Sequence, residues 1–280
     1  MAGETMRTGE PRMIVMSAPN GARKMPSDHP ALPITVSDIA RTAAEVCDAG
    51  ASMIHVHVRD RAGAHLLDAH AYNDVTQAIR REVGERLVVQ ITTEAVGVYS
   101  TVEQVKLVRD VRPEAVSLAV REIVPDEAHE EDAAKFFMWM RDNQVAPQFI
   151  VYDTNDLKRF YHLRDRGLVP FEKAFLLFVL GRYTEPGSAS AHDLVDFLQV
   201  ADQRDVWSVC AFQDLEHKAT VLSAILGGHT RVGFENNTML PDGATAENNA
   251  QLVHMAVQVA TRFGRKPATA DDVREILGMN

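Results

Sequence analysis

Eight short apolar runs separated by longer amphipathic stretches are the feature of this chain that most constrains its fold. Runs rich in β-branched residues predict strands, whereas the stretches between them, such as 36–49, 101–111 and 132–143, have the apolar spacing of helices. Strands that alternate with helices are typical of a parallel sheet with helical crossovers. The predicted strands lie near residues 13–18, 52–58, 86–93, 115–120, 147–152, 174–180, 206–212 and 231–234.

Eight strand–helix repeats in a chain of 280 residues favour a closed (β/α)8 barrel over an open doubly wound sheet, which usually has fewer strands. No linker rich in proline and glycine divides the chain, and no G-x-G-x-x-G segment follows a strand. We therefore predict an α/β fold, a single (β/α)8 TIM barrel over residues 12–280 that forms the catalytic domain. Residues 1–11 are expected to be a disordered leader, and 248–277 two extra C-terminal helices that close the barrel.

The composition excludes several classes of function. A formal net charge of −10 disfavours general binding to nucleic acid or to anionic lipid, both of which require clustered lysine and arginine. No apolar run is long enough to cross a membrane, and the polar N-terminus lacks the apolar centre of a signal peptide. Two cysteines, Cys47 and Cys210, do not make a disulfide framework. We expect a cytoplasmic protein whose partners are small molecules.

Polar residues gather where the predicted strands end. In a (β/α)8 barrel the carboxyl ends of the strands meet at one face, and catalytic residues lie there. The candidates at this face are Asn20, Arg23, His55, His57, Arg59, Thr92, Thr93, Glu94, Arg121, Glu122, Arg231, Glu235 and Asn236.

His55 and His57 indicate a metal site within that set. Two residues apart on a strand, their side chains share one face and can bind the same ion. Glu235 is the predicted third ligand. Barrel closure puts the eighth strand beside the first and the first beside the second, so the second and eighth strands lie roughly 10 Å apart. The two-residue period also puts Arg231 on the face of Glu235. Two histidines and one glutamate form a catalytic zinc set with an open position for substrate.

Simpler roles for these residues stay open. A histidine on a strand is often a hydrogen-bonded core residue, and Arg231 with Glu235 could form an ion pair alone. A hydrolase of the amidohydrolase type also uses two histidines with this spacing. That reading needs further histidines at later strand ends, and 147–153 and 174–180 contain none. The hydrolase is therefore the minor alternative.

Six segments along nearly the whole chain resemble one family, the β-keto acid cleavage enzymes. Their order and spacing together are highly specific. The segments are APNGA at 18–22, AGA at 49–51 followed by HVHVRD at 55–60, QITT at 90–93, RPEAVSL at 112–118, GGHTRVGFENN at 227–237 and NNAQLV at 248–253.

The resemblance implies a TIM barrel with a divalent metal, usually zinc, bound by His55, His57 and Glu235. It implies a reaction in which a β-keto acid and acetyl-CoA give acetoacetate and a new acyl-CoA by Claisen addition and retro-Claisen cleavage. Arg231 would hold substrate and act with a neighbouring acidic base, and Thr92 falls where the family has a Ser or Thr that contacts substrate. The resemblance also implies a homo-oligomer. The residues expected to contact substrate are Thr92, Arg23, Asn20 and Arg121.

The chain departs from the family pattern at positions that affect the chemistry. Asn236 stands where the family has an aspartate, and an amide cannot accept the substrate proton. Arg23 and Ile150 each replace a glutamate, which argues against a cationic substrate and favours a neutral, apolar or additionally anionic keto acid. Glu94 and Arg121 occupy positions where glycine is typical. Glu94 is the candidate replacement base, although it could instead form a structural salt bridge with Arg121.

Catalysis is accordingly assigned to Arg231, Glu94 and Asn236, and two other functions stay open because of Asn236. One is another metal-assisted reaction on a keto acid, such as aldol-type cleavage or hydrolysis. The other is a protein that binds metal and ligand without turnover.

Overall fold

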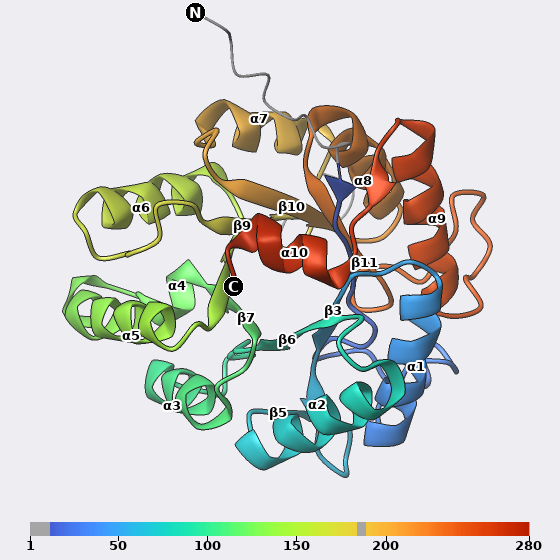
Figure 1. The fold of residues 1–280 in the computed structure, drawn as a ribbon, viewed down its shortest axis with the longest axis horizontal. Helices are drawn as coiled ribbons and strands as arrows, with labels where there is room; N and C mark the ends of the chain where they lie inside the picture. Colours follow the sequence, from blue (N-terminus) through green and yellow to red (C-terminus); the bar gives the residue numbers. More distant parts are fainter. Residues whose placement is uncertain (1–11, 184–188, 280) are drawn as a thin grey trace, which may run out of the picture.

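The computed structural model describes residues 12–183 and 189–279, so the predicted leader lies outside the described residues. Eight parallel strands form a closed barrel in the order β10-β11-β2-β3-β6-β7-β8-β9 (Figure 1). This confirms the predicted fold class. The barrel strands are β2 (Val15–Ser17), β3 (Met53–Val56), β6 (Val88–Thr92), β7 (Ala115–Ala119), β8 (Ala146–Val151), β9 (Phe175–Leu180), β10 (Val206–Ala211) and β11 (His229–Val232).

Helices surround the barrel, and local sequence sets several of their starts. At α1 and α3 the hydroxyls of Thr35 and Ser100 accept a hydrogen bond from the backbone of the acidic residue three positions later, which completes a capping box. Over the described ranges no helix has both the length and the apolar character needed to cross a membrane. The helices are α1 (Val36–Asp48), α2 (Ala69–Val83), α3 (Thr101–Val111), α4 (Val120–Ile123), η1 (Glu127–His129), α5 (Glu130–Asp142), α6 (Thr154–Asp165), α7 (His192–Val200), α8 (Leu215–Leu226), α9 (Asn249–Arg262) and α10 (Ala270–Leu277).

Two predicted strands end earlier than expected. The second ends at Val56, and the chain then forms an outer antiparallel pair of β4 (Val58–Arg59) with β5 (His65–Leu66). The eighth is β11, which ends before Gly233. There the backbone has φ +137°, and a Cβ atom would lie 2.5 Å from the Ala18 carbonyl oxygen. The strand alternation expected for Arg231, Gly233 and Glu235 is therefore wrong, since Glu235 lies in the loop after the strand.

The C-terminal helix α10 closes the amino end of the barrel, as Figure 1 shows at its centre. Val273 of α10 packs with residues from the amino-terminal parts of the barrel strands, among them Met16, Met53 and Val88. The two-stranded pair of β1 (Arg12–Met13) and β12 (Lys266–Pro267) fixes the segment that leads into α10. The predicted closing helices are thus confirmed as α9 and α10.

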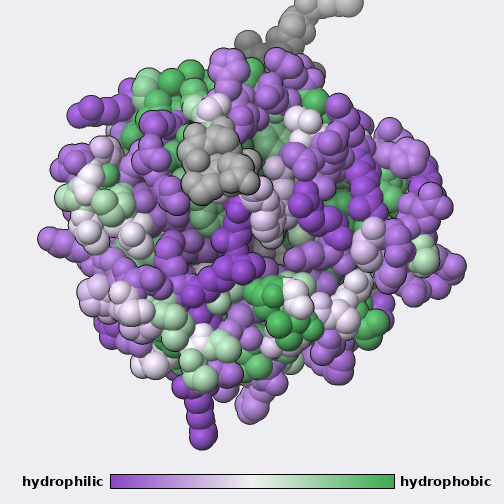
Figure 2. All heavy atoms as spheres, turned by 180° about the vertical axis from the view of Figure 1, so that it is seen from behind, coloured by the Kyte–Doolittle hydropathy of each residue, from purple (hydrophilic) through white to green (hydrophobic). Residues whose placement is uncertain are grey.

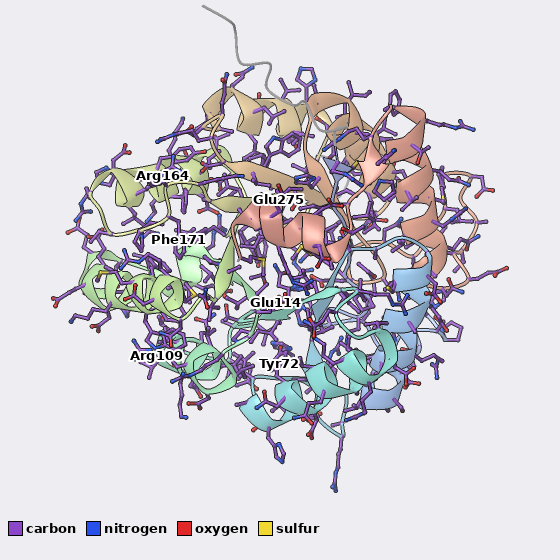
Figure 3. The ribbon with its side chains drawn as sticks, viewed as in Figure 1. Tyr72, Arg109, Glu114, Arg164, Phe171 and Glu275 are labelled. Atoms are coloured by element: carbon purple, nitrogen blue, oxygen red, sulfur yellow. The ribbon has the colours of Figure 1, made fainter. Side chains whose placement is uncertain are left out.

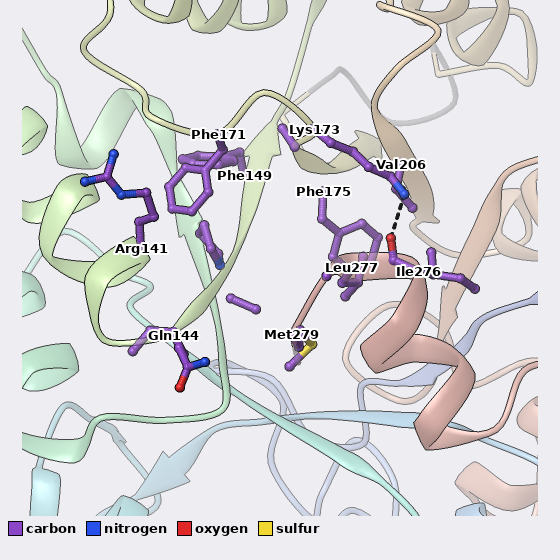
Figure 4. Close-up of a pocket in the computed structure, with 15 residues that line it drawn as sticks. Arg141, Gln144, Phe149, Phe171, Lys173, Phe175, Val206, Ile276, Leu277 and Met279 are labelled. Carbon is purple, nitrogen blue, oxygen red and sulfur yellow. Dashed lines mark hydrogen bonds between the residues drawn. The ribbon is translucent and has the colours of Figure 1, made fainter.

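Ion pairs hold α10 in this place. Glu114, which Figure 3 labels, lies at the amino end of β7. Its carboxylate accepts from Arg274 of α10 at 2.7 Å and from Arg80 of α2 at 2.5 Å. Beside the end of α10 lies a cavity of about 330 Å³, where Phe171, Phe175 and Leu277 contribute apolar walls (Figure 4). Because this cavity lies at the amino end of the strands, it is remote from the face where the candidate catalytic residues converge.

His229, the first residue of β11, couples the stability of this end to pH. Its Nδ1 accepts a hydrogen bond from the backbone N–H of Ile14 at 2.9 Å. Burial, with the nearby Arg265 guanidinium, lowers the pKa of His229 from 6.5 to about 3. A folded-state pKa below the unfolded value contributes stability above pH 6.5 that is lost as the pH falls.

We expect His229 to account for a loss of about 2 kcal/mol in unfolding free energy between pH 7 and pH 5. His229→Asn keeps an acceptor for the Ile14 N–H but cannot be protonated. Urea unfolding of both proteins at the two pH values should therefore show a shallower pH dependence for the variant. An identical dependence would contradict this assignment.

Candidate active site

The carboxyl ends of the strands surround a cavity on the face opposite to α10. Hydrophilic side chains predominate around the centre of this face (Figure 2). The cavity has one polar and one apolar side, which come from different parts of the barrel. Its polar lining includes His55, His57, Thr92, Glu94, Arg231 and Glu235, and its apolar lining includes Ile150, Val179 and Phe212.

Three ligand atoms converge in the polar part of the cavity. They are Nε2 of His55, Nε2 of His57 and a carboxylate oxygen of Glu235, all within 4.8 Å of one another. The two Nε2 atoms lie 3.0 Å apart, and Oε2 of Glu235 lies 3.5 Å from the first and 3.4 Å from the second. Oε2 is buried without a hydrogen-bond partner. A buried acceptor that faces two ring nitrogens is what a cation would satisfy.

Neighbouring groups determine which ring nitrogens carry protons. His65 Nε2 lies 3.0 Å from the backbone oxygen of Glu94, which only accepts, so the His65 proton is assigned to Nε2. Nδ1 of His65 is then the acceptor for Nδ1–H of His57 at 3.4 Å. His55 Nδ1 lies 2.8 Å from Oε1 of Gln90 and donates to it. Both Nε2 atoms therefore present lone pairs, the arrangement found in metal-bound histidines.

The charges of this set also suit a cation. Burial alone would raise the pKa of Glu235, but the Arg231 guanidinium holds it well below its usual value, so the side chain is a carboxylate at neutral pH. Burial lowers the pKa of His55 to about 3, which keeps its imidazole neutral. Deprotonated ligands are the form that binds a metal ion.

Two chain segments hold Glu235 in place. Lys24 donates to the backbone oxygens of Phe234 at 2.6 Å and of Glu235 at 3.0 Å. Gly21, at φ +59°, lies so close that a Cβ atom would be 2.5 Å from Cγ of Glu235. Arg59 organises this loop through hydrogen bonds to backbone oxygens, including Gly21 at 2.8 Å from its Nε. The loop after β2 thus shapes the position of the carboxylate.

Gly21→Ala should displace Glu235 and weaken metal binding by about 10- to 100-fold, the order expected when a group that orients a metal ligand is changed. The matched control is Gly97→Ala, which introduces the same residue at φ +75° with no atom within 4 Å of the new Cβ. Zinc affinity, measured by competition with a chromophoric chelator, should fall only in the first variant. Equal affinities in the two variants would show that Gly21 does not position the carboxylate.

Arg231 and Asn236 are held by each other. Nη2 of Arg231 lies 3.0 Å from Oε1 of Glu235 and 3.3 Å from Oδ1 of Asn236, and Nδ2 of Asn236 donates to the Arg231 carbonyl at 3.2 Å. Arg231 lines the cavity that holds the three ligand atoms, whereas Asn236 lines a second cavity beside it. Asn236 therefore orients the guanidinium of Arg231.

Glu94 brings a carboxylate to the cavity from the loop after β6. Its Oε2 lies 3.9 Å from Nδ1 of His57, and its Oε1 lies 3.4 Å from Arg182 and 3.5 Å from Arg23. Thr92, two residues earlier on the same face, accepts a hydrogen bond from the backbone N–H of Glu94 at 3.0 Å. Both side chains line the cavity, as predicted, although Glu94 reaches it from beyond the end of the strand.

Two residues expected to contact substrate have other partners. Arg121 pairs with Asp156 at 2.6 Å and with Asp153 at 3.2 Å, and it lines a neighbouring cavity. The alternative salt bridge between Arg121 and Glu94 is therefore wrong. Asn20 is buried and bonds to the backbone of His57, donating to its carbonyl at 2.8 Å and accepting from its N–H at 3.2 Å. Asn20 thus positions the end of β3.

Two residues of the site, Gln90 and His65, were not among the candidates from the sequence. Gln90 could have been identified, because it alternates with Thr92 along the strand and so faces the barrel interior. Glu122 was among the candidates at the strand ends, and it lines the cavity, where its Oε2 accepts from the Ala95 N–H at 3.2 Å and from Gln104 at 2.8 Å. His65 had no such signal, since it reaches His57 only through the outer strand pair.

Comparisons with known proteins match nearly the whole chain. A family model described as beta-keto acid cleavage enzyme matches residues 12–279. The 3-keto-5-aminohexanoate cleavage enzyme of Fusobacterium nucleatum is 30% identical over 273 residues, which cover 96% of this chain and 98% of that enzyme. The 3-oxoadipate:acetyl-CoA acetyltransferase of Cupriavidus necator is 23% identical over 95% of this chain and 94% of its own length.

Among solved structures, the binary complex of ObcA with oxaloacetate superposes with a TM-score of 0.71 at 17% identity. The match covers 89% of this chain and 67% of that one, and it supports the barrel fold. The family match extends over nearly the whole chain and contains all three converging ligand residues. The chain belongs to the β-keto acid cleavage enzyme family.

Proposed function

We propose that this protein condenses a β-keto acid with acetyl-CoA to give acetoacetate and a new acyl-CoA, with a divalent metal at His55, His57 and Glu235. The observation that carries the proposal is the convergence of these three ligands at the barrel mouth in a chain of this family. Zinc is the first candidate, because two histidines and a glutamate with an open position form a known catalytic zinc set. The same ligands would accept other divalent ions.

The orphaned oxygen of Glu235 and the two ring lone pairs support this assignment. When bound, the metal would supply a fixed positive charge for the oxygen of the keto acid, where negative charge develops on loss of a C2 proton. Arg231, buried beside Glu235, would add a second positive charge and orient the substrate.

The proposed reaction is balanced. Glu94 removes a proton from C2 of the keto acid, C2 bonds to the acetyl carbonyl carbon, and the C–S bond of acetyl-CoA breaks. The CoA thiolate then bonds to the original keto carbon, and the bond between that carbon and C2 breaks. The proton returns from Glu94 to C2, which yields acetoacetate and the new acyl-CoA.

Glu94 is the proposed base because its carboxylate lines the cavity, whereas the Asn236 amide is bonded to Arg231 and cannot accept a proton. Thr92 is proposed to contact substrate from the same strand face. Arg23 lines the second cavity, beside the loop after β2, which makes it a candidate for contact with the outer part of a substrate.

The relatives add detail that we carry to this chain as part of the proposal. Their names include acetyl-CoA as a reactant with 3-oxoadipate in one case and with 3,5-dioxohexanoate in another. We further propose a cytoplasmic homo-oligomer whose partners are the keto acid and acetyl-CoA.

Mass spectrometry of zinc-loaded protein tests the function directly. The protein is mixed with acetyl-CoA and a panel of β-keto acids whose side chains are anionic, neutral or cationic. We expect acetoacetate together with one new acyl-CoA for at least one acid. No CoA ester from any acid, with zinc still bound, would contradict the proposal. Turnover that needs no CoA thioester would favour aldol-type cleavage or hydrolysis instead.

A further inference from the structure

Three cavities meet at one side chain on the barrel mouth. The first holds the three ligand atoms, the second lies beside the loop after β2, and the third, of about 600 Å³, lies between α6 and α7. Arg182, just after β9, is the residue that lines all three. A molecule that extends from the ligand atoms into either neighbouring cavity can therefore reach this guanidinium.

Arg182 has unused capacity to bind an anion. Among the described residues its ion-pair partner is Glu94 at 3.4 Å, a carboxylate that Arg23 shares at 3.5 Å. Two guanidinium groups on one carboxylate leave one positive charge uncompensated within that part of the chain. Glu122, the other carboxyl group that lines the first cavity beside Glu94, already accepts hydrogen bonds from two N–H groups. The Arg182 guanidinium lies over the Phe212 ring at 4.9 Å. It has five N–H donors, and the ion pair with Glu94 does not use all of them.

The wall between the ligand atoms and Arg182 is apolar. Ile150 and Val179 face the cavity from β8 and β9, and Phe212 follows β10. Ile150 and Phe212 pack with the buried cluster of Leu177, Val179 and Cys210. Such a wall suits methylene groups. The two carboxyl groups that line the same cavity with it, Glu94 and Glu122, already have guanidinium or N–H partners, so a substrate ammonium would be costly to bury there.

Resting on the proposed function, we propose that the keto acid carries a second carboxylate at the far end of its acyl chain and that Arg182 binds it. The methylene groups of the acyl chain then pack on Ile150 and Val179. With 3-oxoadipate as the probe, C2 is transferred with its carboxylate to the acetyl group, and CoA leaves with the four-carbon diacid unit as succinyl-CoA. Arginine suits this task because its planar N–H pairs match a carboxylate.

A matched pair of substrates tests the proposal. The neutral analogue 3-oxohexanoate has the same chain length as 3-oxoadipate and a methyl group in place of the distal carboxylate. We expect wild-type kcat/KM to favour 3-oxoadipate by about 10- to 100-fold, the range for a hydrogen bond to a charged group. Arg182→Gln should bring this ratio close to one through loss on the diacid alone, and Arg182→Lys should restore part of it.

Arg204→Gln is the control, because it removes an exposed guanidinium that pairs with Asp202 before the amino end of β10, away from the cavity, and it should leave the substrate ratio unchanged. Calorimetric binding of both acids to metal-loaded protein provides a readout without turnover, and 3-oxoadipate should bind more tightly. A wild-type preference for 3-oxohexanoate would overturn the proposal. So would an Arg182→Gln variant that keeps the substrate ratio and raises the KM of acetyl-CoA, since Arg182 would then bind a CoA phosphate.

Failure of the proposed function looks different from failure of this inference. If neither acid nor any other of the panel yields an acyl-CoA, the cleavage reaction itself is refuted. If 3-oxohexanoate or a cationic acid is cleaved faster than 3-oxoadipate, the reaction stands and the role of Arg182 falls.

Discussion

Glu235→Gln should abolish high-affinity metal binding and lower kcat/KM by at least about 1,000-fold, which corresponds to about 4 kcal/mol of transition-state stabilisation. The amide keeps the shape of the side chain and an oxygen for Arg231 at Oε1. It replaces the anionic oxygen that faces His55 and His57 with an N–H donor or a neutral oxygen. A neutral ligand at this point removes the charge that balances the cation.

Metal content after dialysis against limiting zinc, measured by inductively coupled plasma mass spectrometry, tests this expectation. Wild-type protein should hold one zinc per chain and the variant far less. Circular dichroism controls for folding, because loss of the carboxylate leaves the buried Arg231 guanidinium without its ion-pair partner. A folded variant that retains stoichiometric zinc would show that Glu235 is not a ligand.

Glu94→Gln should lower kcat by about 100- to 10,000-fold, the range attributed to a general base. The variant keeps the size of the side chain and does not touch the three ligand atoms, so zinc should remain bound. Exchange of the C2 hydrogens of the keto acid in deuterated water, followed by NMR without acetyl-CoA, should slow by a similar factor. The exchange readout separates proton removal from acyl transfer.

Glu122→Gln is the matched control for that experiment. Its carboxyl lines the same cavity but already accepts from the Ala95 N–H and from Gln104, and the amide oxygen of glutamine can keep these bonds. We expect less than about a tenfold change, since the group takes no part in proton transfer. If Glu122→Gln shows the larger loss, or Glu94→Gln keeps wild-type exchange, the base has been assigned to the wrong residue.

The barrel was predictable because its signals are local. Each strand is a short apolar run, and each run is followed by residues that cap or begin a helix, as at α3, where the predicted bounds 101–111 match the structure. The convergence of His55, His57 and Glu235 was also predictable, because closure of the barrel fixes the order β11-β2-β3. Local apolar runs sufficed for the barrel, and strand order sufficed to bring Glu235 near the two histidines.

Contacts made by loops were not predictable in this way. The Arg121 side chain pairs with Asp156, a contact between α4 and α6. The strand pattern of the sequence does not predict how these two helices pack. Likewise, Glu235 reaches the histidines from a loop, after a glycine with positive φ ends β11 early. His65 orients His57 through an outer strand pair that has no counterpart in the repeating pattern. Such contacts depend on side-chain packing between segments distant in sequence.

Carbon tracing is the most direct test of the central claim, which is acetyl transfer to C2 of a β-keto acid at this site. Zinc-loaded protein is mixed with the best keto acid of the panel and acetyl-CoA that carries ¹³C at both acetyl carbons. We expect acetoacetate with both labelled carbons and a new acyl-CoA with none. Labelled acetate would mean that acetyl-CoA is hydrolysed, and unlabelled acetate together with the carboxylic acid of the acyl part would mean that the keto acid is hydrolysed. Either result would contradict acetyl transfer to C2.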